Sequence, residues 1–306
     1  MKDEVKHIPV LLAEVIDNLH LNKRIGRGEK PKVIDATVGA GGHSTEIVQR
    51  GANLLGIDAD ESMLNLAREN LKKACPAPEN TQEPCFTLIQ GNFRDIDKIA
   101  TKNGFNKVSN ILLDLGISSV HLDESKRGFS FKDETQVLDM RLDPETQGPA
   151  AKDLLKLLRE DQLEEMFLLA MPGWEARKLA KHVAFARVLA PIETVGDFLK
   201  VCAVLPQGKR THPATKAFMA LRMAVNTELS NLAEVLPKAL DLLETGGRLL
   251  IISFHSGEDR IVKKVFQNWE KENKGVVITG PIFPSESEVQ VNPRSRSAVL
   301  RVFEKK

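Results

Sequence analysis

The stretch KVIDATVGAGGHS, residues 32–44, decides the fold class of this chain. It begins as a short apolar run that suits a buried parallel strand, and a glycine-rich turn follows at residues 39–42. Glycines at a strand-to-helix turn let the backbone approach a ligand closely, and the next helix offers free N–H groups. The stretch therefore predicts a strand, a ligand-binding turn and a helix.

The same alternation continues along the chain. Short apolar runs at 53–58, 85–91 and 110–116 alternate with helix candidates that start near His43, Glu61 and Arg94. Such repeats predict an α/β fold with a doubly wound open sheet that binds its ligand at the carboxyl ends of the strands. A fifth strand is expected at 248–254. The runs at 275–283 and 297–304 are expected to close the sheet as an antiparallel pair.

The alternation stops for about a hundred residues after Gly116. A polar segment with Gly and Pro covers 117–150, and long ordered loops of this kind are uncommon unless they are functional. Helical patterns follow, and a later helix is expected to break at Pro237. We therefore predict a core in two parts, 1–117 and 214–306, with an inserted helical substrate-recognition subdomain at 118–213.

Composition excludes several classes of protein. With 306 residues, 42% hydrophobic and 28% charged, the chain can bury a proper core. It has no apolar run near the ~20 residues of a membrane span and no signal-peptide pattern, so a cytoplasmic protein without a membrane partner is expected. Three cysteines without a CxxC pair predict three reduced thiols, no zinc site and no bound metal.

Two further features of composition bear on function. The chain has no tyrosine, which excludes chemistry that needs a phenol hydroxyl. From Pro206 to the end it has 16 Lys and Arg against 11 Asp and Glu, an excess that permits a polyanionic partner.

The residues at the strand ends narrow the ligand class. Asp58 closes the second expected strand, where an acid can accept hydrogen bonds from ribose hydroxyls, although it could instead cap the next helix, a role also open to Asp60. A dinucleotide site would have a third glycine where this chain has Ser44. Phe93 and Asp114 follow the third and fourth strands, and Phe93 could equally be a core residue. Acids beside a sulfonium and an amino group favour S-adenosylmethionine over NAD.

Ten motifs spread over nearly the whole chain carry a resemblance to a known family. They are HIPVLLAEV (7–15), DATVGAGGHS (35–44), GID (56–58), ILLDLGISS (111–119), RGFSF (127–131), LDMRLD (138–143), HPATKAF (212–218), ALRMAVNTEL (220–229), GGRLLIISFHSGEDRIVK (246–263) and NPRSRSAVLR (292–301). With these motifs the chain resembles the RsmH (MraW) family, bacterial methyltransferases that modify the exocyclic N4 of a cytidine in small-subunit ribosomal RNA.

The resemblance implies a class I S-adenosylmethionine-dependent methyltransferase, with a Rossmann-like sheet, that acts at the decoding centre of the assembled or nearly assembled small subunit. It also implies seven cofactor contacts: Gly41, Gly42, His43, Asp58, Phe93, Asp114 and His121. His121 stands where family members commonly have Gln, and its ring can still donate a hydrogen bond.

Chemistry on a cytosine amino group needs hydrogen-bond acceptors and a base. Many amino-group methyltransferases place a Pro-Pro-aromatic turn after the fourth strand, but here Asp114 is followed by Leu115 and Gly116. The acceptors must therefore come from Asp114, a backbone carbonyl or the inserted loop, where Asp139 is the catalytic candidate. His255, at the end of the fifth expected strand, is a second candidate that could contact RNA or relay a proton. Asp139 could instead form a local ion pair with Arg141, which is also a substrate-binding candidate, and His255 could cap the following helix.

Substrate contacts are expected from aromatic and basic side chains. Phe129 and Phe131 could stack on an extruded base or form a small buried strand segment. Arg294 and Arg296 could contact RNA phosphates, as could Arg177, Lys181, Lys209 and Arg210. Asn226 could contact a base or be a helix N-cap, and the N-cap is favoured.

Three functions compete. The leading hypothesis is an RNA N4-cytosine methyltransferase. The alternatives are a catalytically silent RNA-binding or ribosome-assembly factor on the same scaffold and a nicotinamide-dependent oxidoreductase. The sequence leaves the oligomeric state and the proton acceptor open.

Overall fold

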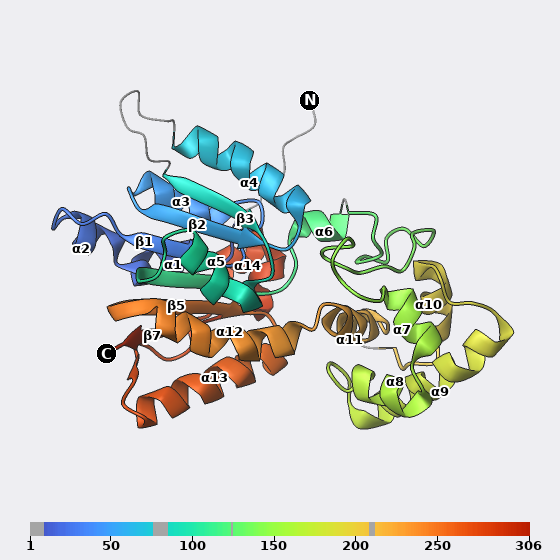
Figure 1. Cartoon of the computed structure of the whole chain (residues 1–306). Helices are drawn as coiled ribbons and strands as arrows, with labels where there is room; N and C mark the ends of the chain where they lie inside the picture. Colours follow the sequence, from blue (N-terminus) through green and yellow to red (C-terminus); the bar gives the residue numbers. More distant parts are fainter. Residues whose placement is uncertain (1–8, 76–84, 124, 208–211) are drawn as a thin grey trace. The chain divides into compact units, whose positions relative to one another are not determined.

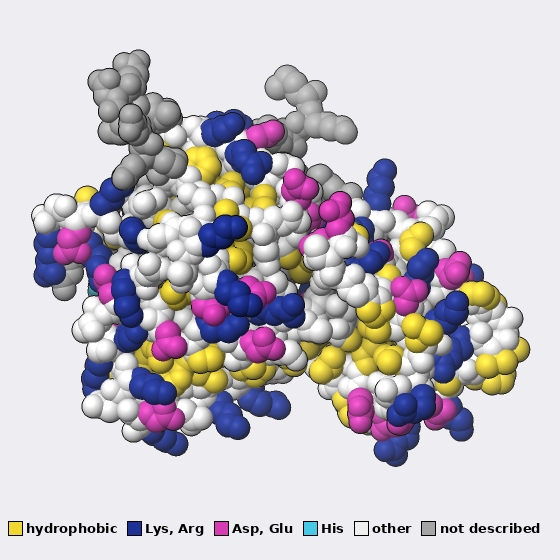
Figure 2. Space-filling view, viewed as in Figure 1, with side chains coloured by type: hydrophobic (Ala, Val, Ile, Leu, Met, Phe, Trp, Pro, Cys, Tyr) yellow, Lys and Arg dark blue, Asp and Glu magenta, His cyan; other side chains and the backbone are white. Residues whose placement is uncertain are grey.

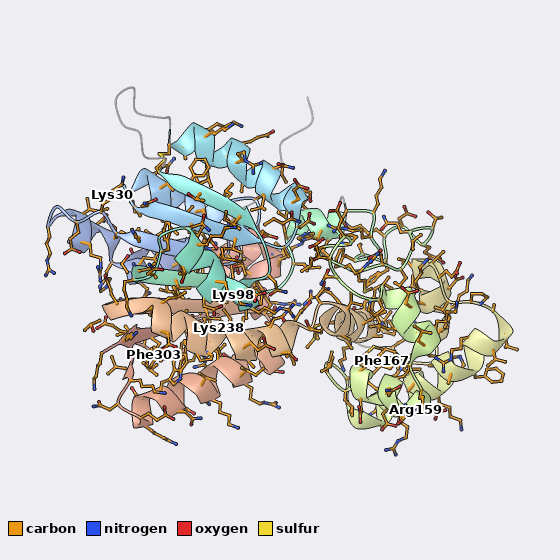
Figure 3. The ribbon with its side chains drawn as sticks, in the orientation of Figure 1. Lys30, Lys98, Arg159, Phe167, Lys238 and Phe303 are labelled. Carbon is orange, nitrogen blue, oxygen red and sulfur yellow. A yellow bond between two sulfur atoms is a disulfide. The ribbon has the colours of Figure 1, made fainter. Side chains whose placement is uncertain are left out.

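The computed structural model describes residues 9–75, 85–123, 125–207 and 212–306. The chain divides into two compact units (Figure 1): Met1–Gly116 with Ser230–Lys306, and Ile117–Leu229. Each unit has its own hydrophobic core. In Figure 3, Phe303 marks a core of the first unit and Phe167 marks the core of the second.

The first unit is built on one seven-stranded sheet in the order β3-β2-β1-β4-β5-β7-β6. Neighbouring strands from β3 to β5 are parallel, and β7 is antiparallel to both β5 and β6. The predicted α/β fold and its closing antiparallel pair are confirmed. The strands are β1 (Lys32–Asp35), β2 (Asn53–Asp58), β3 (Phe86–Gln90), β4 (Val108–Asp114), β5 (Leu243–Ser253), β6 (Gly275–Val277) and β7 (Val299–Lys305).

The register of the parallel strands brings their polar ends to one edge. Asp58 at the end of β2 is paired with Gln90 at the end of β3. Asp35 at the end of β1 is paired with Leu112 of β4, and β4 continues to Asp114. The segments that follow β1, β2, β3 and β4 therefore start from the same edge, which is where a doubly wound sheet binds its ligand.

Helices cover both faces of the sheet. Side chains alternate between faces along each strand, so that Val33 and Leu54 belong to one core cluster while Ile34 and Leu55 belong to the other. The first cluster includes side chains of α1 (Leu12–Leu19), α3 (Gly42–Gln49) and α4 (Glu61–Ala74). The second includes side chains of α5 (Ile96–Lys102), α12 (Glu228–Leu242) and α13 (Ser256–Lys271). Shorter elements of this unit are α2 (Leu21–Ile25), η1 (Phe93–Asp95), α14 (Glu286–Val291) and η2 (Pro293–Ser297).

The break predicted at Pro237 is wrong, because α12 continues through this residue. A proline inside a helix removes one backbone hydrogen bond and costs about 3 kcal/mol. Val235, Leu236 and Ala239 are fully buried on either side of it. Fully burying an aliphatic side chain of Val or Leu size stabilises by about 1.5–3 kcal/mol, so the packing outweighs the cost.

The second unit is helical and longer than expected. It contains α6 (Ser119–Asp123), α7 (Ala151–Leu157), α8 (Glu160–Phe167), α9 (Gly173–Leu189), α10 (Val195–Cys202) and α11 (Thr215–Val225). It continues past residue 213, where we predicted its end, to Leu229. The reason is that α11 places Ala217, Phe218 and Leu221 in the core of the helical unit.

The prediction of three reduced thiols is wrong for two of the cysteines. Cys75 at the end of α4 and Cys85 just before β3 are joined in a disulfide. The two are ten residues apart in sequence, and α4 packs beside β3, so the fold brings their sulfur atoms together. Cys202 is free, and burial raises the pKa of its thiol well above the ordinary range.

In the parts of the chain that the structure describes, no helix has both the length and the apolar character that a membrane crossing requires.

Candidate functional site

The turn between β1 and α3 depends on its glycines. Gly39 and Gly41 have φ angles of +52° and +86°, which residues with a side chain rarely adopt. The Gly41 N–H donates to the Val38 carbonyl at 2.8 Å and closes the turn. Because α3 begins at Gly42, its first N–H groups lie at the carboxyl edge of the sheet. The turn therefore offers backbone donors to a polar ligand.

Asp58 faces this turn from the end of β2. Its Oδ2 accepts a hydrogen bond from the Gly39 N–H at 2.8 Å, and its Oδ1 accepts one from the Asp60 N–H at 2.9 Å. The helix cap is Asp60, whose Oδ1 accepts from the Ser62 N–H at 2.9 Å. The alternative role considered for Asp58 therefore belongs to Asp60. A carboxylate offers about four acceptor positions, and these two backbone donors occupy two of them.

Two further acids stand at the ends of β1 and β4. Asp35 is 2% exposed and accepts a hydrogen bond from the Ser44 Oγ at 2.7 Å. Burial raises the pKa of Asp35 to about 6, although the Ser44 bond opposes the shift. Burial also raises the pKa of Asp114 well above its ordinary value, and the charges of Asp35 and Glu258 add to this effect.

The Asp114 side chain is poised for a ligand. Its Oδ1 is buried, and in the described part of the chain it has no hydrogen-bond partner. The side chain as a whole is still 23% exposed. A buried, unpaired acceptor beside other acids is unfavourable until a cationic or donor group reaches it. The arrangement at this edge therefore favours a ligand that carries positive charge.

His43 is held between the N-terminal segment and Asp114. Its ring is 5% exposed, and Nε2 lies 2.9 Å from the Val10 carbonyl oxygen. A carbonyl only accepts, so Nε2 carries the proton and Nδ1 faces Asp114, whose Oδ2 is 3.7 Å away. His43 is therefore a buried side chain that lies between the Val10 carbonyl and Asp114, next to the predicted cofactor site.

Phe93 follows β3 at the same edge. It begins η1, which Asn92 caps by accepting a hydrogen bond from the Arg94 N–H at 3.0 Å. Its ring is partly buried and packs against a core cluster of the first unit. Phe93 therefore packs on the core while part of the side chain stays exposed, so its role as a cofactor contact stays a prediction.

His255 has the cap geometry that was its alternative role. Its Nδ1 accepts hydrogen bonds from the N–H groups of Gly257 and Glu258 at the start of α13. Its Nε2 lies 3.3 Å from Oε1 of Glu258, whose Oε2 accepts from the Phe254 N–H. The Nδ1 contacts are those of a structural cap, whereas Nε2 is buried and makes no hydrogen bond within the described residues.

Asp139 and Arg141 form the local ion pair that was the alternative to a catalytic role. Arg141 donates from Nε and Nη2 to the Asp139 carboxylate at 2.9 and 2.8 Å. Burial alone would raise the pKa of Asp139, but the hydrogen bonds from Arg141 outweigh it, and this pKa lies below its ordinary value. Asp139 is therefore a weak base.

Asn226 is not the N-cap that we predicted. It is the C-cap of α11, and its side chain joins that helix to the segment around Arg141. The amide donates to the Met140 carbonyl at 2.8 Å and accepts from the Leu142 N–H at 3.0 Å. The prediction failed because these partners are more than 80 residues away in sequence.

The aromatic candidates of the helical unit differ in exposure. Phe129 is a core side chain, 7% exposed, and Phe131 is partly buried. The ring of Phe131 lies 4.9 Å from that of His212 and 5.5 Å from that of Phe218. Neither phenylalanine belongs to a strand. His121 is buried 5.7 Å from the Phe129 ring, and its Nδ1 accepts from the Ser118 N–H.

The basic candidates are mostly at the surface. Arg294 and Arg296 are exposed on η2, and Lys181 is exposed on α9. Arg177 is paired with Glu164, with Nη2 and Oε1 3.1 Å apart. Lys209 and Arg210 lie outside the described residues. Figure 2 shows that basic, acidic and hydrophobic side chains are interspersed on the visible face of both units.

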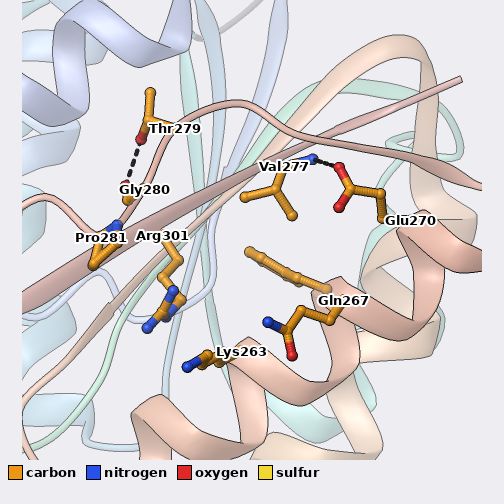
Figure 4. A pocket seen from close by; sticks show the side chains of 9 residues that line it. Lys263, Gln267, Glu270, Val277, Thr279, Gly280, Pro281 and Arg301 are labelled. Carbon is orange, nitrogen blue, oxygen red and sulfur yellow. Dashed lines mark hydrogen bonds between the residues drawn. The ribbon is translucent and has the colours of Figure 1, made fainter.

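A separate cavity of about 270 Å³ lies between α13 and the segment that includes β6 and residues 279–281 in the first unit. Phe266, Val277 and Pro281 supply apolar walls, and Lys263 and Arg301 lie at one side (Figure 4). Arg301 is paired with the Asp259 carboxylate at 2.6 and 3.0 Å. The cavity contains none of the predicted site residues.

Sequence reasoning missed Asp35, Ser44 and Glu258 as parts of the site. Asp35 and Ser44 both stand within the stretch that predicted the turn, and the strand-end position of Asp35 was the available signal. Glu258 had no such signal, because its electrostatic effect on Asp114 acts between segments 144 residues apart.

Comparisons with known proteins give a consistent result. Residues 4–306 match the family model of the MraW methylase family. The chain is 37% identical over 325 residues to a ribosomal RNA small subunit methyltransferase H from Bacteroides fragilis (strain YCH46), and the match covers 100% of both chains. It is 38% identical over 327 residues to the protein of the same name from Lachnospira eligens, covering 99% of this chain and 98% of that one.

Among solved structures, an rRNA methylase from Streptococcus thermophilus has a TM-score of 0.42 at 12% identity, with 90% of this chain and 87% of that chain covered. The full-length matches in sequence, together with the sheet and its carboxyl-edge residues, show that this chain belongs to the MraW methylase family.

Proposed function

We propose that this protein is an S-adenosylmethionine-dependent methyltransferase of small-subunit ribosomal RNA that methylates the exocyclic N4 of a cytidine in the decoding centre. The observation that carries the proposal is the carboxyl edge of the sheet. There a glycine turn, the Asp58 carboxylate and the acids Asp35 and Asp114 meet in a member of the MraW methylase family.

The residues at this edge fit S-adenosylmethionine. Asp58 accepts hydrogen bonds from the ribose hydroxyls, and the N-terminus of α3 with Gly41 and Gly42 receives the polar groups of the amino-acid part. Asp35 and Asp114 stabilise the positive charge of the ligand. The buried Asp114 oxygen has no hydrogen-bond partner in the described part of the chain, so a cationic group beside it is favourable. When bound, the cofactor supplies an electrophilic methyl group on a sulfonium.

The same geometry disfavours the nicotinamide alternative. In a dinucleotide site the third glycine of the fingerprint allows close packing between helix and strand. Here Ser44 takes that position, is fully buried and donates to Asp35. The acids at the edge would also repel a pyrophosphate.

We assign the role of proton acceptor for the amino group to Asp114, which ends β4 at the carboxyl edge and has one buried oxygen without a hydrogen-bond partner in the described part of the chain. An effective base has a pKa near the operating pH, and the pKa of Asp114 is raised whereas that of Asp139 is lowered. A bound sulfonium would favour the ionised form of Asp114, which is the form that can accept the proton of the amino group.

The other site residues have positioning roles in this proposal. Asp139 and Arg141 hold the segment 138–143 as an ion pair, and His255 orders the start of α13. Phe131 offers a partly open ring to a base, and Arg294 and Arg296 contact RNA phosphates without reading sequence. The helical unit is the substrate-recognition subdomain.

The partner is the assembled or nearly assembled small ribosomal subunit, and the protein works in the cytoplasm, where this substrate is found.

The proposal is tested by transfer of labelled methyl groups to isolated small subunits, free rRNA and DNA, followed by nucleoside analysis. The expected product is N4-methylcytidine from the small subunit. A ring-carbon or ribose methyl product would overturn the N4 assignment, and no transfer to any substrate would favour a silent assembly factor.

Asp114→Asn provides the matched test of the base. This variant keeps the size and one acceptor oxygen of the side chain but cannot take a proton. We expect its kcat to fall by about 100-fold or more, within the usual range for general-base catalysis. A variant with full kcat would remove Asp114 as proton acceptor and leave the methyltransferase assignment standing.

A further inference from the structure

The first described residues of the chain, Pro9–Leu11, form a strap against the predicted cofactor turn. A Cβ atom on Gly42 would lie 2.5 Å from Cγ of Pro9, so these two residues are in direct contact. The Val10 carbonyl accepts the hydrogen bond from His43 Nε2 at 2.9 Å. The strap thus contacts the residues that begin α3, and displacing it would loosen both of them.

The strap is held in an unfavourable backbone conformation. Leu11 has a φ of +53°, in the left-handed region that costs a residue with a side chain about 1–2 kcal/mol. Its side chain is fully buried with Val10 in the core cluster that includes Val38 of the turn. A strained residue keeps such a conformation only when its surroundings hold it there.

One long-range hydrogen bond provides that hold. The Leu11 N–H donates to Oε1 of Glu288 at 2.8 Å, across 277 residues of sequence. Glu288 is itself placed by the start of α14, where its N–H donates to the Ser285 Oγ at 3.1 Å. A hydrogen bond from a backbone N–H to a carboxylate is stronger than one between neutral groups.

The geometry points to Glu288 as a positioning residue of the cofactor site. It fixes the strap, the strap fixes Gly42 and His43, and Nδ1 of His43 lies 3.7 Å from the Asp114 carboxylate. This inference rests on the proposed cofactor site, and it assigns to Glu288 a control of cofactor affinity from outside that site.

The test is the affinity of the full-length protein for S-adenosylmethionine, measured by calorimetry without RNA. Glu288→Ala is expected to weaken binding about 3- to 10-fold, less than the full contribution of a hydrogen bond to a charged group, because Glu288 acts on the site only through the strap. Glu288→Gln keeps an acceptor oxygen without its charge, so it is expected to weaken binding less than Glu288→Ala does, by about threefold at most. The matched control is Glu286→Ala, which removes the same charge from an exposed position of the same helix and should bind normally.

Kinetics separate positioning from general loss of structure. At saturating cofactor the Glu288→Ala variant should recover most of the wild-type kcat while the KM for cofactor rises, because Glu288 contacts the strap and none of the proposed reacting groups. Should Glu288→Ala fail to fold, Glu288→Asp withdraws the acceptor but keeps the charge, and it should raise the dissociation constant as well.

Three results would overturn the inference: normal affinity in the variants that lose the acceptor, equal weakening in Glu288→Gln, or equal weakening in Glu286→Ala. Failure of the proposed function gives a different result. In that case the wild type binds S-adenosylmethionine and the Glu288 variants differ as described, but no methyl group reaches ribosomal RNA.

Discussion

Replacing Asp58 by alanine tests the cofactor site most directly. The carboxylate accepts the N–H groups of Gly39 and Asp60 at 2.8 and 2.9 Å, so it both shapes the glycine turn and meets the ligand in our proposal. Asp58→Ala removes two acceptor oxygens from a half-buried position. Water can reach the freed N–H groups there, so the free energy of unfolding should change little. The substitution should therefore act mainly on the free energy of ligand binding.

The magnitude follows from the hydrogen bonds lost. A hydrogen bond to a charged group contributes about 1.5–3 kcal/mol, and two ribose hydroxyls share this carboxylate. Allowing for solvent at the half-buried site, we expect a loss of about 2–4 kcal/mol in cofactor binding. This corresponds to a dissociation constant about 30- to 900-fold higher. Binding to RNA should change by less than about threefold, a difference below 1 kcal/mol.

Equilibrium dialysis with S-adenosylmethionine and filter binding with ribosomal RNA measure the two affinities separately. Asp60→Asn is the matched control, because it removes a neighbouring charge and keeps a good helix cap. It should leave cofactor affinity within about threefold of the wild type. Equal losses of cofactor and RNA binding in Asp58→Ala would refute the two-site reasoning, and an unchanged cofactor affinity would refute the role of Asp58.

Three other predictions follow from the described contacts. Burial raises the pKa of Asp35 to about 6, so its contribution to stability is present below about pH 4 and is lost as the pH rises to about 6. The free energy of unfolding of Asp35→Asn should therefore exceed that of the wild type by up to about 3 kcal/mol at pH 7 and by little at pH 4. Urea unfolding at the two pH values measures this difference, and equal gains at both would contradict the reasoning. Asn226→Ala leaves a buried backbone donor and acceptor unpaired and should lower the free energy of unfolding by about 2–4 kcal/mol, whereas a loss below about 0.5 kcal/mol would show that its bonds carry no stability. Arg294→Ala with Arg296→Ala should weaken RNA binding and reduce the slope of log K against log salt by about 1.4, and an unchanged slope would remove both from the phosphate contacts.

Much of the fold could be predicted because its signals are local. Buried parallel strands are continuous apolar runs, and each is followed by a helix, so the residues from Lys32 to Asp114 predict a doubly wound sheet. Strand ends of such a sheet share one edge. This rule placed Asp58 and Asp114 together without knowledge of side-chain contacts.

The predictions from sequence that proved wrong have two causes. Some depend on contacts between distant segments, and in others tertiary packing outweighs a local preference. Pro237 is a helix breaker by local preference, but burial of its neighbours keeps α12 intact. The disulfide between Cys75 and Cys85 depends on how α4 packs beside β3. The boundary of the helical unit moved because α11 packs into the core of that unit.

By itself, the sequence determined the α/β sheet, the glycine turn and the acids at its carboxyl edge, because strand periodicity and turn chemistry act over a few residues. Only the tertiary structure decided the pKa values of those acids and the contacts around them. Burial raises the pKa of Asp35 and Asp114, and a glutamate 277 residues away holds the strap beside the turn. Burial and long-range hydrogen bonds depend on which segments the folded chain brings together, and no local pattern encodes them.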